Sequence, residues 1–276
     1  MSTALAVVGG GNMGTALVAG LRRARQGDAD AGGSGEVVLV ERLPARRRQL
    51  EQRFTDGGVT VAADLPPSVG SAVIAVKPHD VEAACRDLAA AGAGRVLSIA
   101  AGVTLSSLRG WLGDGPAVLR AMPNTPALVS AGASAVAPGP GAGEADVAWA
   151  RGILEAVGSV EVVEERHLDA VTGLSGSGPA YLFLVAEALI DGGVLNGLPR
   201  AVAARLATQT ILGAGRMLTE SGESPEALRA AVTSPGGTTA AGLRALEARA
   251  VRAALLEAVT ASAERAAELG RGGPPA

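Results

Sequence analysis

Short apolar runs alternate with longer stretches of helical periodicity through the first half of the chain. The uncharged run Ala4–Val8 precedes Asn12–Gln26, where apolar residues recur at helical spacing, and a Gly-, Ser- and Asp-rich loop at Gly27–Gly35 follows. Further helices are expected at Pro44–Phe54 and Val81–Ala91. The other strand-like runs are Val37–Val40, Val59–Val61, Ala72–Val76, Val96–Ile99 and Ala117–Leu119. Strands covered on both faces are continuously apolar, so this alternation predicts a doubly wound parallel sheet with helices on both sides.

After about residue 158 the strand pattern fades and helical periodicity takes over. One last apolar run, Val160–Val163, precedes this change. The expected helices are Pro179–Leu195, Arg200–Thr219, Pro225–Val232, Gly237–Leu246 and Val251–Leu269. We therefore predict an α/β domain over residues 1–160, an all-helical domain over 161–270 and a disordered tail over 271–276.

Composition narrows the class of protein. Of the 276 residues, 48% are hydrophobic and 18% are charged, which is enough apolar material for a folded core. The net charge of −3 and the 2% aromatic content supply neither the basic face nor the stacking rings of a nucleic-acid-binding protein. Cys85 is the only cysteine, and His79 and His167 are the only histidines. We therefore expect no disulfide framework and no metal site.

The expected location follows from what the chain lacks. Its longest uncharged stretch, Ala121–Gly143, is interrupted by four prolines, whereas a membrane-spanning helix needs about 20 predominantly apolar residues. The first residues carry no basic region of the kind that begins a signal peptide. We expect a soluble cytoplasmic protein that does not contact a membrane.

A glycine-rich segment directly follows the first strand run, which ends at Val8. The residues Gly9-Gly10-Gly11-Asn12-Met13-Gly14 fit the pattern G-x-G-x-x-G and open the first helix. In this pattern the glycines allow a tight turn, close approach of a pyrophosphate and close helix–strand packing, while the helix N-terminus favours negative charge. The position of the match predicts a dinucleotide-binding, Rossmann-type domain.

Two other strand ends carry candidate ligands of a dinucleotide. Glu41 and Arg42 follow the second strand, where an acidic residue often accepts a hydrogen bond from the ribose 2′-hydroxyl. A solvated charge at a strand end is an equally good interpretation. Ala75-Val76-Lys77-Pro78 ends a later strand, at the edge where open α/β sheets bind ligands. Lys77 is the only lysine in a chain otherwise rich in arginine, which favours a specific role over an ordinary surface position.

Two motifs lie in the helical half. The segment Gly173–Pro179 is similar to a G-x-S-x-G nucleophile elbow but has Ser177 at the last position, so close packing at a helix start is the better interpretation. The segment Thr233–Thr239 contains adjacent glycines just before a helix and could present backbone N–H groups to an anion. A helix–helix turn explains it equally well.

Taken together, these motifs resemble one family, Δ1-pyrroline-5-carboxylate reductase, which catalyses the last step of proline synthesis. The resemblance covers nearly the whole chain. Its segments are GGGNMG, AVKP at 75–78, AAGV at 100–103, MPNTP at 122–126, TGLSGSGPAY at 172–181, DGGV at 191–194, GLPR at 197–200 and TSPGGTTAAGL at 233–243.

The resemblance implies a Rossmann domain followed by a helical dimerisation domain, in a homodimer or larger homo-oligomer whose active sites are completed across the dimer. It implies hydride transfer from a nicotinamide to the C=N carbon of a cyclic imino acid, giving L-proline. The implied cofactor-binding residues are Val8, Gly9, Gly10, Gly11, Asn12, Met13, Gly14, Glu41, Arg42, Asp64, Ala75, Val76, Lys77, Pro78, Ala100 and Ala101. The implied substrate-binding residues are Glu165, Ser234, Gly236, Gly237, Thr238 and Thr239, with Thr239 and Lys77 as the catalytic pair.

The form of the nicotinamide is predicted from the same resemblance. The family and the basic residues Arg42, Arg46, Arg47 and Arg48 favour NADPH, whereas Glu41 would repel a 2′-phosphate if it points into the site. We expect NADPH, with NADH as the alternative and no metal.

Two other functions remain open at this point. A β-hydroxyacid dehydrogenase-like reductase would place its catalytic lysine on a helix of the second domain, where this chain has none. A non-enzymatic dinucleotide sensor would bind the cofactor without turnover, and it gives no reason for the Ser234–Thr239 loop.

Overall fold

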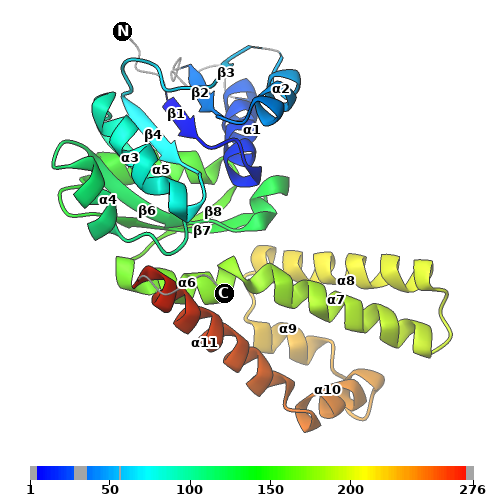
Figure 1. Ribbon diagram of the computed structural model, residues 1–276. Helices are drawn as coiled ribbons and strands as arrows, with labels where there is room; N and C mark the ends of the chain where they lie inside the picture. Colours follow the sequence, from blue (N-terminus) through cyan, green and yellow to red (C-terminus); the bar gives the residue numbers. More distant parts are fainter. Residues whose placement is uncertain (1–4, 28–35, 56, 272–276) are drawn as a thin grey trace. The chain divides into compact units, whose positions relative to one another are not determined.

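The computed structural model describes residues 5–27, 36–55 and 57–271 (Figure 1). Ala4, most of the loop expected at Gly27–Gly35 and residues 272–276 of the expected tail lie outside the described residues.

An eight-stranded sheet occupies the first half of the chain, in the order β3-β2-β1-β4-β5-β6-β7-β8. All neighbouring strands are parallel except β6 and β7. The strands are β1 Leu5–Val8, β2 Val37–Val40, β3 Val59–Ala62, β4 Ser71–Ile74, β5 Arg95–Ser98, β6 Ala117–Met122, β7 Gly132–Pro138 and β8 Gly158–Val162. Chain order reverses between β1 and β4, and such a switch point opens a crevice at the carboxyl ends of the strands.

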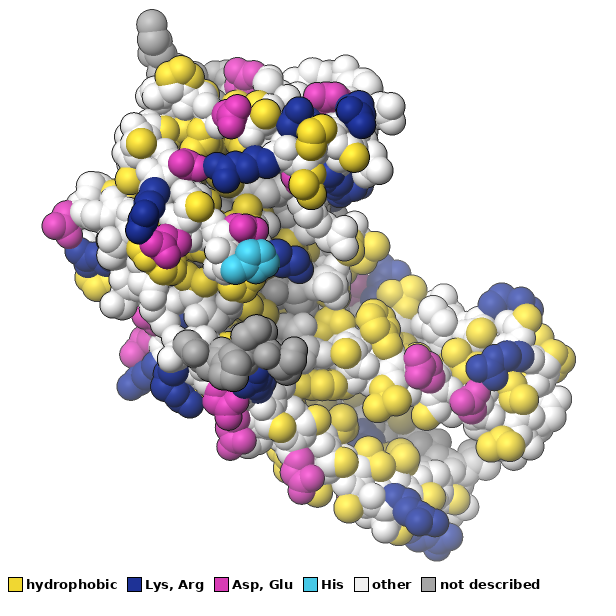
Figure 2. All heavy atoms as spheres, in the orientation of Figure 1, with side chains coloured by type: hydrophobic (Ala, Val, Ile, Leu, Met, Phe, Trp, Pro, Cys, Tyr) yellow, Lys and Arg dark blue, Asp and Glu magenta, His cyan; other side chains and the backbone are white. Residues whose placement is uncertain are grey.

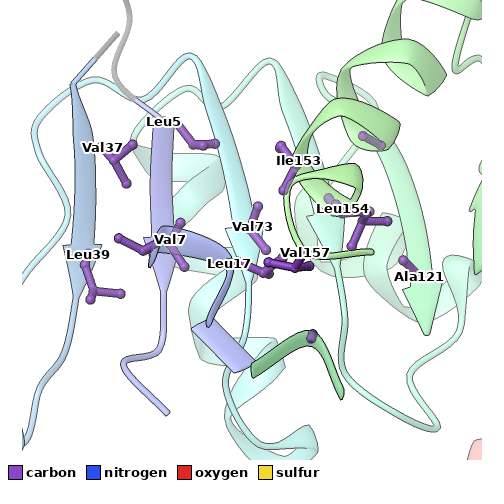
Figure 3. Packing of buried hydrophobic residues seen from close by; sticks show 14 of the residues in the cluster. Leu5, Val7, Leu17, Val37, Leu39, Val73, Ala121, Ile153, Leu154 and Val157 are labelled. Carbon is purple, nitrogen blue, oxygen red and sulfur yellow. The ribbon is translucent and has the colours of Figure 1, made fainter. Parts of the chain in front are cut away.

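Helices cover both faces of the sheet, as the alternating pattern predicts. One buried cluster joins the strands to α1 (Asn12–Gly27), α2 (Pro44–Arg53) and α5 (Glu144–Glu155); Figure 3 shows Leu17, Ile153 and Leu154 within it. A second cluster packs α3 (Val81–Ala90) and α4 (Leu105–Leu112) on the opposite face. The predicted fold class is confirmed, and the antiparallel strand β7 is an addition to it.

Short helical segments lie between β4 and α3, between β6 and β7, and between β8 and the first long helix. They are the 3-10 turns η1 Pro78–Asp80, η2 Thr125–Val129 and η3 Glu165–His167, the helix α6 Leu168–Val171 and the π-helix η4 Thr172–Gly176. The long helices are α7 Gly178–Leu195, α8 Arg200–Glu220, α9 Pro225–Ala231, α10 Thr238–Ala248 and α11 Val251–Gly270. The predicted helices of this half are present, each within a few residues of its expected ends.

The chain divides into two compact units, residues 1–177 with 261–276 and residues 178–260. In the second unit α7 and α8 pack closely, since a Cβ on Gly193 would lie 3.0 Å from the Ala203 Cβ. Only Ala203 and Ala207 are buried in this unit, while Phe183, Leu184 and many other apolar side chains are exposed. Figure 2 shows hydrophobic side chains spread over its visible face. The unit therefore leaves most of its apolar surface uncovered.

The segment Glu165–Leu195 is long and apolar enough to cross a membrane when judged by length and composition alone. The core helix of a soluble protein passes the same test. The expectation of no membrane contact therefore stays a prediction.

Candidate functional site

A cleft of about 1110 Å³ lies in the first unit, where the carboxyl ends of β1 and β4 meet at the switch point of the sheet. Fifteen of the sixteen residues predicted to bind the cofactor line it, Gly14 being the exception. The remaining lining residues are Val40, Leu43, Leu65, Pro66, Pro67, Asp80, Ala84, Asp87, Ala90, Ala91, Ile99, Met122, Pro123, Thr125 and Leu128.

Three glycines, which carry no Cβ, shape the turn between β1 and α1. Gly9 has φ +114°, and a Cβ there would lie 2.7 Å from the carbonyl carbon and oxygen of Ala75. A Cβ on Gly14 would lie 2.0 Å from the Gly9 carbonyl oxygen, so Gly14 packs behind the cleft wall. A Cβ on Gly11 would have no atom within 4 Å. The turn thus passes close to β4 and keeps open space beside Gly11.

The first turn of α1 borders the cleft through Asn12 and Met13. The first N–H groups of a helix have no partner within it and carry partial positive charge. Together with the space at Gly11, they fit the pyrophosphate of a dinucleotide.

Glu41 is held at the edge of the cleft directly after β2. Its Oε2 accepts a hydrogen bond from the Gly10 N–H at 3.2 Å, and its Oε1 accepts one from the Leu43 N–H at 2.8 Å. Its own N–H donates to the Ala62 carbonyl at 2.9 Å. The carboxylate therefore bridges the glycine turn and the start of α2. It is hydrogen-bonded to the backbone and is not a freely solvated charge at a strand end.

The arginines that follow Glu41 in the sequence do not pair with its carboxylate in the hydrogen bonds and ion pair described next. Arg42 Nη2 forms an ion pair with Asp87 Oδ2 on α3 at 2.5 Å. Arg46 Nε donates to the Gly10 carbonyl at 2.9 Å, and Arg47 Nη1 donates to the Glu41 carbonyl at 3.1 Å. Sequence reasoning did not find Asp87, because only the packing of α3 on the sheet brings it to Arg42.

Lys77 is exposed in the loop between β4 and η1 and lines the cleft. On the neighbouring α3, Ala84 faces the cleft and Cys85 is fully buried. Burial, with a smaller contribution from Glu82, raises the pKa of the Cys85 thiol to about 12. That thiol therefore stays protonated at neutral pH. Lys77, which lines the cleft, is the better candidate for contact with a bound ligand at this end of the sheet.

The MPNTP segment at 122–126 contributes Met122, Pro123 and Thr125 to the cleft lining, and Leu128 follows it there. Within it Asn124 is buried; its Nδ2 donates to the Ser175 carbonyl at 3.0 Å and its Oδ1 accepts from the Ala133 N–H at 2.9 Å. A Cβ on Gly176 would lie 2.7 Å from Met122 Cε. The close packing expected for the Gly173–Pro179 motif is therefore present, in the form of a π-helix.

Glu165 lies away from the cleft lining. Its Oε1 accepts hydrogen bonds from the Leu105 N–H at 2.7 Å and from Arg120 Nη1 at 3.1 Å. Arg120 is buried in β6, so this carboxylate neutralises a charge inside the first unit. The predicted contact of Glu165 with substrate is not tested by this geometry and stays a prediction.

The segment Ser234–Gly237 forms a tight turn before α10. The Gly237 N–H donates to the Ser234 carbonyl at 3.1 Å, with Pro235 second and Gly236 third at φ +70°. This arrangement is a type II turn, which requires a residue tolerant of positive φ at its third position. No side chain caps α10, and a Cβ on Gly237 would lie 2.3 Å from Ser234 Oγ. The turn belongs to the second unit, and the cleft to the first.

Among the residues that the structure describes, no three His, Cys, Asp or Glu side chains are grouped so that they could hold a metal ion.

Comparison with known proteins identifies the family. The pyrroline-5-carboxylate reductase of a Synechocystis species is 42% identical over 276 residues, covering 98% of this chain and 100% of that protein. The chain belongs to the pyrroline-5-carboxylate reductase family. The Arabidopsis thaliana reductase is 44% identical over 81% of each chain. A solved reductase from Coxiella burnetii has a TM-score of 0.87 at 34% identity, covering 98% of this chain and 99% of that chain.

Two family models match separate parts of this reductase. The model for NADP oxidoreductases, coenzyme F420-dependent, matches residues 4–102, and the model for pyrroline-5-carboxylate reductase dimerisation matches residues 165–269. The chain is thus an oxidoreductase with a dimerisation domain, and neither alternative function is favoured. The compact-unit division and the second model begin at different residues, so the boundary expected at residue 160 stays a prediction.

Replacing Glu165 by glutamine tests its structural role. Glu165→Gln should lower the free energy of unfolding by about 1–3 kcal/mol, because the buried Arg120 loses its counter-charge. Chemical denaturation measures this, with Glu155→Gln as the matched control, since Glu155 pairs with Arg151 in the exposed part of α5. The control should stay within about 0.5 kcal/mol. An unchanged stability with a raised KM for the imine would instead assign Glu165 to the substrate.

Proposed function

We propose that this chain reduces the C=N bond of 1-pyrroline-5-carboxylate to L-proline with a reduced nicotinamide dinucleotide, as the last step of proline biosynthesis. The observation that carries the proposal is the cleft at the switch point, lined by fifteen predicted cofactor residues, in a chain 42% identical to a reductase of this name over its full length. A neighbouring structure, the reductase of Plasmodium falciparum, is described with NADP bound; it is 27% identical with a TM-score of 0.80, covering 97% of this chain and 98% of that chain.

Different residues of the cleft would bind different parts of the dinucleotide. The N–H groups at Asn12 and Met13 would hold the pyrophosphate, and Glu41 lies where the adenosine ribose of a Rossmann ligand is bound. Lys77 and Pro78 would border the nicotinamide end, after β4. When bound, the dihydronicotinamide supplies the hydride that reduces the imine carbon. The chain contributes orientation of the two reactants, and imine reduction needs no Schiff base with Lys77.

The turn before α10 is the proposed substrate-binding loop. Its two glycines leave backbone N–H groups free to approach a carboxylate, and the N-terminus of α10 adds favourable potential. The hydroxyl of Thr239, or of Thr238 as second choice, would donate to or accept from the ring nitrogen and fix the face that is reduced. Thr239 is half-buried, whereas Ser234 and Thr238 are exposed.

The exposed apolar helices support a homodimer or a larger homo-oligomer. A unit with two buried residues cannot cover Phe183, Leu184 and their neighbours alone, and a second copy of the dimerisation domain supplies matching apolar faces. We propose that the active sites are completed across this assembly, and that the protein acts in the cytoplasm.

The sequence predicts NADPH as the reductant, with NADH as the alternative, and the described residues bear on this choice in both directions. The family and Arg42, Arg46, Arg47 and Arg48 favour NADPH, whereas the position of Glu41 favours NADH.

An assay of NADPH and NADH oxidation, with and without pyrroline-5-carboxylate, tests the proposed function. Oxidation should require the imine, and mass spectrometry should find proline as the product. Dinucleotide binding without turnover would contradict the proposal and restore the sensor alternative.

Thr239→Ala should lower kcat/KM for the imine about 5- to 150-fold, the equivalent of one hydrogen bond of about 1–3 kcal/mol. Dinucleotide affinity should stay near the wild-type value, as calorimetry would show. Thr239→Ser should restore most of the activity, and Thr219→Ala, whose hydroxyl bonds to its own helix, should change nothing. A loss of dinucleotide affinity with normal turnover at saturating cofactor would refute the assignment.

Lys77→Met should weaken cofactor or substrate binding about 2- to 10-fold, as expected for one exposed charge worth about 1 kcal/mol, without changing stability. Lys77→Arg, which keeps the charge, should recover part of the loss. Steady-state kinetics and thermal unfolding measure both effects. Unchanged kinetics in Lys77→Met would return the residue to an ordinary surface position.

A further inference from the structure

The lining of the cleft is acidic. Glu41, Asp64, Asp80 and Asp87 contribute carboxylates, whereas Arg42 and Lys77 are the basic residues among its described lining. Arg42 is already paired with Asp87. Lys77 follows β4, whereas Glu41 and Asp64 follow β2 and β3 at the other side of the switch point. Negative charge therefore predominates at the end of the cleft beside β2 and β3.

Glu41 is fixed in that end of the cleft by two backbone N–H groups, those of Gly10 and Leu43. Turning its carboxylate out of the cleft would break both hydrogen bonds. A carboxylate in this place is an acceptor for ribose hydroxyl groups, and it repels a phosphate on the same ribose.

Three of the neighbouring arginines, Arg42, Arg46 and Arg47, contact other groups than a ribose phosphate. Arg46 and Arg47 donate to the carbonyls of Gly10 and Glu41 and do not line the cleft. Arg42 does line it, but its guanidinium is held by Asp87, across from the end of β2. To reach a ribose phosphate, Arg42 would have to give up its exposed ion pair with Asp87, which leaves one more unpaired carboxylate in an already acidic lining.

We propose that Glu41 and Asp87 together make this cleft select the dinucleotide without a 2′-phosphate, so that NAD(H) binds more tightly than NADP(H). Glu41 acts directly on the ribose, and Asp87 acts through Arg42 as a positioning residue. A 2′-phosphate adds nearly two negative charges at neutral pH, which this lining opposes. The inference rests on the proposed function, since it concerns the cofactor of that same cleft.

Calorimetric titration with NAD⁺ and NADP⁺ tests this preference without relying on turnover. The wild-type protein should bind NAD⁺ at least about 10-fold more tightly than NADP⁺. Glu41→Gln and Asp87→Asn should each shift the ratio of the two dissociation constants toward NADP⁺ by about 3-fold or more, and the double variant further. Adenosine 2′,5′-bisphosphate and 5′-AMP, as shorter probes, should show the same shift, which would place the effect at the adenosine ribose.

Glu82→Gln is the matched control, because Glu82 lies on the same helix as Asp87, pairs with Arg86 and does not line the cleft. In this control the ratio of the dissociation constants for NAD⁺ and NADP⁺ should equal that of the wild type. Tighter binding of NADP⁺ than NAD⁺ by the wild type, with normal imine reduction, would overturn the inference and leave the proposed function standing. An unchanged ratio in both Glu41→Gln and Asp87→Asn would overturn the assignment to these residues. Binding of neither dinucleotide would refute the proposed cleft and the inference together.

Discussion

The close approach of the first turn to the end of β4 is the constraint on which the cleft depends. Gly9 passes Ala75 at a distance that leaves no room for a Cβ, and Gly14 does the same against the Gly9 carbonyl. These two contacts fix where α1 begins, and hence where its free N–H groups lie relative to β4. The carboxylate of Glu41 then bonds to the same turn, so the geometry of one segment sets the positions of the others.

Local features of the fold could be predicted because they depend on neighbouring residues. Buried parallel strands such as Val37–Val40 are short apolar runs, and the glycine turn has a pattern that few other structures require. The strand β7 is not predicted by the residue pattern because Gly132–Pro138 is rich in small residues, ends at a proline and pairs antiparallel with β6. The residue pattern does not predict the helices α4 and α5 either, although Thr104 caps the N-terminus of α4.

The site could be predicted at the level of its backbone, but not at the level of its ion pairs. Residues that follow strands of one parallel sheet gather at one edge, so Glu41, Lys77 and Ala100 share a cleft by topology alone. The pairs Arg42–Asp87 and Arg120–Glu165 join side chains 45 residues apart in each case. Their formation depends on how helices pack on the sheet, which residue patterns do not specify. The π-helix at Thr172–Gly176 likewise has no periodic signal.

The nearly coreless second unit also determines how this protein responds to dilution. In the proposed oligomer, a helical unit with two buried residues gains stability from association, and association obeys mass action. The unfolding temperature of such a protein rises with protomer concentration, and folding and assembly become one equilibrium. In that proposed oligomer, an exposed helix such as α7 is a folding element whose partner lies on another chain, and the cellular amount of the protein becomes one of the quantities that stabilise it.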